Sequence, residues 1–86
     1  MTIQIIDTTV SHSKEDGYIG HVVFQYADHT AKYEITLQSK NKKEWNYSLN
    51  FALESGKEED ILFVDEQLEE DDELFDYLVD AVVSKL

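Results

Sequence analysis

The chain of 86 residues contains no cysteine, no arginine and no proline, and it has only three glycines. Without cysteine it has no disulfide, no thiolate nucleophile and no thiolate metal ligand, which is typical of a reducing, cytoplasmic location. Without arginine it lacks the side chain best suited to bidentate contacts with phosphates and bases, so we do not expect direct binding to nucleic acid. The three glycines, at positions 17, 20 and 56, are too scattered for a glycine-rich phosphate loop.

The sequence also lacks an apolar run of about 18 residues and a basic region before a shorter apolar run. We therefore expect no membrane span, no secretion signal and no membrane partner. The apolar content of 42%, with five tyrosines, four phenylalanines and one tryptophan, is sufficient for a packed core. No repeat or linker divides the chain, so we predict a single domain over residues 1–86.

Acidic residues are concentrated in the last part of the chain. Residues 1–53 carry six acids and five lysines, a net charge of −1, whereas residues 54–86 carry thirteen acids and two lysines, a net charge of −11. Such a field attracts basic partners and repels nucleic acid and anionic membranes. We expect residues 1–53 to form a sheet and residues 54–86 to form an acidic helical segment.

Four segments of the first part have the alternating, β-branched or aromatic pattern of strands, at residues 3–10, 18–26, 30–38 and 44–51. The third and fourth segments each have one apolar and one polar face, which is typical of an antiparallel sheet with one solvated side. The polar residues 11–17 and the basic loop 39–43 connect the strands, and Asp28 and His29 form a two-residue hairpin. With that turn, Tyr26 pairs with Ala31, Phe24 with Tyr33 and Val22 with Ile35, so that the apolar sets share one side.

Apolar residues near the C-terminus recur at steps of three and four, the spacing of an amphipathic helix: Leu74, Phe75, Leu78, Val79, Val82, Val83 and Leu86. Asp71 or Asp72 is placed to cap its N-terminus. We predict an α+β fold, in which a four-stranded antiparallel meander packs one face against this C-terminal helix. The expected core consists of Tyr33, Ile35, Trp45, Tyr47, Leu49, Phe75, Leu78 and Val82.

Residues 57–68, between the sheet and the last helix, allow two interpretations. Ser55 and Glu58 match a capping box, which favours a short helix. The continuous apolar run 61–64 is also typical of a buried fifth strand. Both alternatives remain open from the sequence.

Residues that could carry chemistry are present, but their spacing does not favour a reaction centre. The acidic run 69–73 lacks the glycine that a calcium loop of the EF-hand type needs at its sixth position. His12, His21 and His29 have no spacing that would direct two imidazoles at one ion, and the Ser11–His12 neighbourhood lacks a third orienting group. We expect no metal, no cofactor and no catalytic residue.

Two surfaces remain as candidates for binding. The first is the acidic face of the last helix and its approach, made of Glu69, Asp72, Glu73, Asp76 and Asp80. The second is an apolar patch of the first two strands, made of Ile3, Ile5, Ile19 and Val23, because strict alternation leaves these strands apolar on both sides.

These features favour a non-catalytic protein-interaction module that binds a basic protein partner. The alternative is a nucleic-acid mimic, in which carboxylates about 5–6 Å apart along a helix imitate phosphates and occupy a DNA- or RNA-binding protein. We expect a monomer or a weak homodimer.

Overall fold

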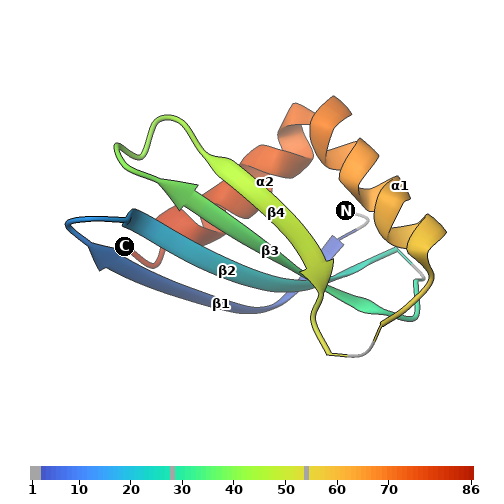
Figure 1. Cartoon of the computed structure of the whole chain (residues 1–86). Helices are drawn as coiled ribbons and strands as arrows, with labels where there is room; N and C mark the ends of the chain where they lie inside the picture. Colours follow the sequence, from blue (N-terminus) through green and yellow to red (C-terminus); the bar gives the residue numbers. More distant parts are fainter. Residues whose placement is uncertain (1–2, 28, 54) are drawn as a thin grey trace.

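The computed structural model describes residues 3–27, 29–53 and 55–86 of the chain. The elements within these ranges are β1 (Ile3–Ser13), β2 (Gly17–Tyr26), β3 (Lys32–Ser39), β4 (Asn46–Phe51), α1 (Glu58–Glu70) and α2 (Asp72–Val83). Each strand pairs antiparallel with the next one, so the order in the sheet is the order in the chain. Both helices cover the same face of the sheet (Figure 1). The predicted α+β meander is confirmed.

The register between β2 and β3 is the one that the apolar pattern predicts. Phe24 pairs with Tyr33 and Val22 with Ile35, which places four buried side chains on the helix-covered face. The third predicted pair, Tyr26 with Ala31, lies just before β3 begins. Of the predicted hairpin residues, Asp28 lies outside the described part of the chain, while the His29 N–H donates to the Tyr26 carbonyl at 3.0 Å.

The hairpin between β1 and β2 is longer than the sequence pattern indicates. Pairing continues to Ser13 opposite Gly17, so the connection is confined to residues 14–16. Gly17 has a φ of +78°, a left-handed conformation that glycine adopts at little cost. A Cβ there would also lie 2.6 Å from the Ser39 carbonyl oxygen, so glycine is required on both grounds.

A β-bulge at Ile6 corrects the predicted faces of β1. Ile5 pairs with Phe24, but the next paired residue is Asp7, opposite Val23. Because Ile6 is one extra residue, the alternation of the two faces is reversed after it. Odd-numbered residues before the bulge and even-numbered residues after it therefore lie on the same face. Ile3 and Ile5 therefore lie on the helix-covered face with Val10, and the prediction that they share an outer patch with Ile19 and Val23 is wrong.

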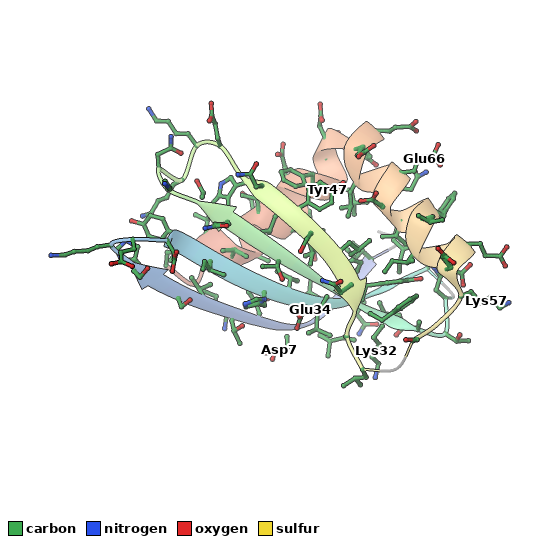
Figure 2. The ribbon with its side chains drawn as sticks, viewed as in Figure 1. Asp7, Lys32, Glu34, Tyr47, Lys57 and Glu66 are labelled. Carbon is green, nitrogen blue, oxygen red and sulfur yellow. The ribbon has the colours of Figure 1, made fainter. Side chains whose placement is uncertain are left out.

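The ambiguous segment forms a helix, α1. Val64 and Leu68, one turn apart, are buried against the sheet, whereas Leu62 and Phe63 are half exposed. The predicted capping box does not form. The backbone is still extended at Lys57, which is the N-cap and makes no side-chain cap hydrogen bond. The helix therefore begins at Glu58 rather than directly after Ser55, and Figure 2 shows Lys57 at this end of α1.

The predicted C-terminal helix is α2, and Asp71 is its N-cap. One carboxylate oxygen of Asp71, Oδ1, accepts from the backbone N–H of Glu73 at 3.1 Å and of Leu74 at 3.3 Å. The Asp71 N–H donates to the Gln67 carbonyl at 2.8 Å. Asp71 therefore ends α1 and starts α2 in a single residue.

The two helices and the sheet share one core. All eight predicted core residues belong to it: Tyr33, Ile35, Leu78 and Val82 are buried, and Trp45, Tyr47, Leu49 and Phe75 are partly buried against them. α2 contacts β1 and β2, and α1 contacts β4. A Cβ at Gly20 would lie 2.5 Å from both γ-carbons of Val82, so the glycine allows α2 to approach β2 closely.

Candidate interaction surface

The structure places the five predicted acidic residues at the surface but on two helices. Asp72, Glu73, Asp76 and Asp80 are exposed on α2, while Leu74, Leu78 and Val82 are buried on its opposite side. Asp72, Asp76 and Asp80 follow one another at intervals of one turn. Glu69 is exposed near the end of α1 and lines a groove described below.

No ion pair within residues 3–27, 29–53 and 55–86 neutralises the negative charge on the helical layer, residues 58–83. The layer holds twelve acidic residues and no lysine or histidine. Across the described ranges, the one ion pair joins His21 and Glu34 on the sheet. The basic loop after β3 does not supply counter-charges, and Lys42 instead places its Nζ 4.8 Å from the centre of the Tyr18 ring. The exposed carboxylates of the helices therefore present a negative field to solvent, with no ion-paired counter-charge in the described ranges.

The predicted apolar patch is not assembled. Ile3 is buried and Ile5 packs against the core, because the bulge turns both toward the helices. Ile19 and Val23 are half-buried on the other face, where they pair with Ser11 and Asp7 of β1. Two separated apolar residues among polar neighbours do not form a continuous surface.

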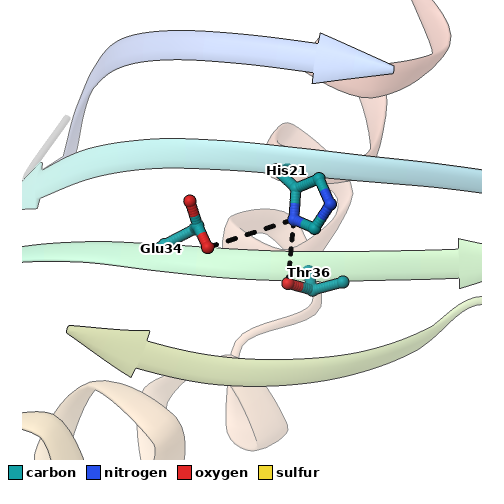
Figure 3. Close-up of polar contacts among 3 residues, drawn as sticks. All are labelled: His21, Glu34 and Thr36. Atoms are coloured by element: carbon teal, nitrogen blue, oxygen red, sulfur yellow. Dashed lines mark hydrogen bonds and ion pairs between the residues drawn. The ribbon is translucent and has the colours of Figure 1, made fainter. Parts of the chain in front are cut away.

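The uncovered face of the sheet carries a small polar cluster around His21. Its Nδ1 lies 3.0 Å from the Thr36 hydroxyl oxygen and 4.0 Å from a carboxylate oxygen of Glu34 (Figure 3). The side chains of His21 and Glu34 are 42% and 37% exposed, so water screens the pair. These contacts orient an imidazole on the uncovered, partly exposed face of the sheet.

A groove lies between the last strand and the first helix. It encloses about 460 Å³ and is lined by Tyr47, Ser48, Leu49, Ile61, Leu62, Asp65 and Glu69. Because α1 lies beside β4 (Figure 1), one wall is an edge of the sheet and the other a flank of the helix. Leu62 is 59% exposed, which leaves apolar surface open in the groove.

Tyr47 links the two walls at the acidic end of the groove. It points from β4 toward the helices (Figure 2), and its hydroxyl donates to Oδ1 of Asp65 at 2.8 Å. Burial raises the pKa of the Tyr47 hydroxyl above its ordinary value of 10.0, and the hydrogen bond to Asp65 raises it further. The ring also packs on Phe75, with 5.6 Å between ring centres. Tyr47 therefore stays protonated and fixes α1 against β4.

An aromatic cluster at the opposite end of the sheet surrounds His29. Its Nδ1 lies 2.9 Å from the Tyr33 hydroxyl, and its ring lies close to Tyr26 and Phe63. Burial, followed by the negative charge of Asp60, raises the pKa of Tyr33. This cluster attaches the other flank of α1 to β2 and β3.

No group of three or more His, Asp or Glu side chains in the described ranges has a geometry that could hold a metal ion. The histidines lie apart: His12 packs on the Tyr18 ring, His21 on the uncovered face, and His29 beside Tyr33. Of the two helices described, neither is long and apolar enough to cross a membrane.

Comparisons with protein-family models, with curated proteins and with solved structures found no match for this chain. The sequence predicted Glu69 as a binding residue, but the groove that it lines was not predicted. One feature of the sequence does indicate a binding site at this edge. The last strand of a meander is an edge strand, and residues 46–51 carry no charge that would protect such an edge.

Proposed function

We propose that the protein is a non-catalytic interaction module that binds a basic segment of a partner protein through its helical layer. The observation that carries this proposal is the unneutralised charge of that layer, with twelve acidic residues and no lysine between positions 58 and 83. Charges of one sign on one side of a small domain speed encounter with oppositely charged partners. The proposal retains the cytoplasmic location expected from the sequence.

A nucleic-acid mimic is the second candidate. It is favoured by the row of Asp72, Asp76 and Asp80, which are exposed on α2 at one-turn intervals. A mimic would occupy the nucleic-acid site of its partner, whereas a general module would bind elsewhere. Competition by DNA and RNA for the partner therefore separates the two candidates.

The test compares two variants of equal net charge. In the first, four helical carboxylates are neutralised: Glu69→Gln, Glu73→Gln, Asp76→Asn and Asp80→Asn. In the matched control, four exposed carboxylates outside the helices are neutralised: Asp7→Asn, Glu15→Gln, Asp16→Asn and Glu44→Gln. Each variant reduces the net charge of −12 by the same amount.

Partners are captured from a native lysate at low and at high salt, and association rates are then measured with a purified partner. The helical variant should lose binding, mainly through a slower on-rate, whereas the control should retain it. Steering by exposed charges is screened beyond about 8 Å at physiological ionic strength, so wild-type binding should weaken steeply with salt. Equal binding by wild type and the helical variant at low salt would refute the proposal.

A further inference from the structure

The two free edges of the sheet differ in how they are protected. Natural edge strands avoid unwanted pairing through bulges, charged side chains or proline. β1 has a bulge at Ile6 and the charged Asp7 next to it. β4, with the sequence NYSLNF, has no charge and no proline, and its pairing with β3 is regular throughout. β4 is thus an edge that can accept another strand.

The backbone of β4 directs three residues toward that free edge. The Ala52 N–H donates to the Lys32 carbonyl at 2.9 Å, which makes these two residues a hydrogen-bonded pair at the end of the β3–β4 ladder. Hydrogen-bonded pairs alternate along an antiparallel ladder. The N–H and C=O groups of Tyr47, Leu49 and Phe51 therefore point away from β3.

The groove beside this edge has an apolar half and an acidic half. Leu49 and the half-exposed Leu62 line the first, together with Ile61. Asp65 and Glu69 line the second, next to Tyr47. A strand added to β4 would direct every second side chain into this groove, because successive side chains alternate between the two faces of a sheet.

We propose that the groove between β4 and α1 binds an extended segment of a partner protein as a fifth strand. Backbone hydrogen bonds to Tyr47, Leu49 and Phe51 hold the segment, apolar side chains contact Leu49 and Leu62, and a lysine or arginine lies beside Asp65 and Glu69. This inference rests on the proposed function and specifies how the basic partner is bound.

A second copy of the chain is a poorer occupant of the same edge. It carries a net charge of −12, and its own α1 would bring further carboxylates to Asp65 and Glu69. Like charges at such a contact oppose association. Charge complementarity therefore selects a basic partner over self-association.

The first test uses synthetic peptides as long as β4, which has 6 residues. Every second residue, which should face the groove, is in turn valine, valine and lysine. The residues between them are threonine, and both ends of the peptide are capped. The sequence is made in both directions, so that one peptide suits antiparallel and the other parallel addition. Titrations of the full-length protein followed by NMR should show binding of one direction in preference to the other. Failure of both peptides to bind would overturn the proposal.

Backbone methylation of the better peptide then tests strand pairing itself. In one derivative the groove-facing residues are N-methylated, and in the other the threonines are. Only one of these two sets donates its N–H groups to β4 in an added strand. One derivative should therefore lose at least about tenfold in affinity, or about 1.4 kcal/mol, relative to the other. Equal affinities of the two derivatives would rule out addition to an edge.

A pair of protein variants tests the groove. Leu62→Ser removes the exposed apolar wall, and the matched control Leu86→Ser makes the same change at the exposed C-terminal residue. Peptide affinity should fall on the order of tenfold in the first and stay unchanged in the second. Equal effects of the two substitutions would overturn the groove as the binding site.

The outcomes separate this inference from the proposed function. If neutralising the three α2 carboxylates alone (Glu73→Gln, Asp76→Asn and Asp80→Asn) weakens partner binding while Leu62→Ser does not, the charged layer binds its partner outside the groove, and only the inference is wrong. Sedimentation of the free protein should show a monomer at the concentrations used. A dimer dissociated by the peptide would show that a second copy occupies β4, which contradicts the assignment to a basic partner.

Discussion

The two helices cover the same face of the sheet but bury different shares of their apolar residues. On α2, Leu74, Leu78 and Val82 are at most 7% exposed and lie across β1 and β2, and its most exposed large apolar residues, Tyr77 and Val83, are 37% and 40% exposed. On α1, Val64 and Leu68 are buried, while Leu62 and Phe63 remain 59% and 47% exposed. The helix that buries more of its apolar surface contributes more to folding, because stabilisation scales with the apolar area removed from water.

The helices also begin differently. α2 has a side-chain cap from Asp71, whereas Lys57, the N-cap of α1, makes no side-chain cap hydrogen bond. Both helices carry acidic residues in their first turn, where the helix dipole favours them, so the cap is the difference between the two N-termini. α2 is thus the more firmly formed element. α1 has fewer buried contacts and borders the groove at the sheet edge, as expected for a binding element.

Truncation of one leucine on each helix should give the largest difference in stability between an α1 variant and an α2 variant. Leu78→Ala should lower the free energy of unfolding by about 2–5 kcal/mol, since the side chain is fully buried. Leu62→Ala should change it by less than about 0.5 kcal/mol, as surface substitutions do. Urea melts of both variants provide the measurement. Similar losses would contradict the division of roles between the helices.

Alkaline pH should weaken the attachment of α1 in particular. The two tyrosines whose pKa values are raised, Tyr33 and Tyr47, both lie near carboxylates of α1, Asp60 and Asp65. A raised pKa in the folded state means that folding favours the protonated hydroxyl. The stability that this contributes is complete below about pH 10 and is lost as the pH rises through the folded-state values.

Denaturant melts at about pH 9 and about pH 11 should therefore show a lower stability at the higher pH. Tyr47→Phe should reduce the difference between the two, since phenylalanine does not titrate. Tyr77→Phe, at an exposed position on α2, is the matched control. An unchanged difference in the Tyr47 variant would show that the hydrogen bond to Asp65 does not stabilise the fold.

Substitution of the two N-cap residues, Asp71 and Lys57, should give the smallest difference in stability between the helices. Asp71→Ala should cost about 1 kcal/mol because two backbone N–H groups lose their acceptor. Lys57→Ala should cost nothing, since no side-chain cap is lost there. Thermal melts at one ionic strength compare the two variants. Destabilisation by Lys57→Ala equal to that by Asp71→Ala would show that the N-terminus of α1 is also fixed by its first side chain.

The sequence was sufficient for features that depend on a regular local pattern. The alternation in β2 and β3 predicts the Phe24–Tyr33 pairing, and the spacing of Leu74, Leu78 and Val82 predicts α2 and its contact with the sheet. The bulge at Ile6 could not be predicted, because an inserted residue is defined only by the pairing with β2.

α1 was ambiguous for a related reason. All four residues of the run 61–64 are apolar, so the sequence shows no polar face. Only the packing shows that Val64 is buried while Leu62 and Phe63 are exposed. The acidic surface was predicted from charge segregation alone. The groove depends on how α1 lies beside β4, which is a tertiary relationship between segments that are separate in the chain.

Amide hydrogen exchange, with and without the valine–lysine peptide, tests most directly whether a strand adds to the edge of β4 beside α1. The N–H groups of Tyr47, Leu49 and Phe51 should exchange more slowly when the peptide is present, because an added strand accepts their hydrogen bonds. Amides of β1 and of α2 should exchange at unchanged rates. Slowed exchange along β1 or α2 with no change at these three β4 residues would contradict the account.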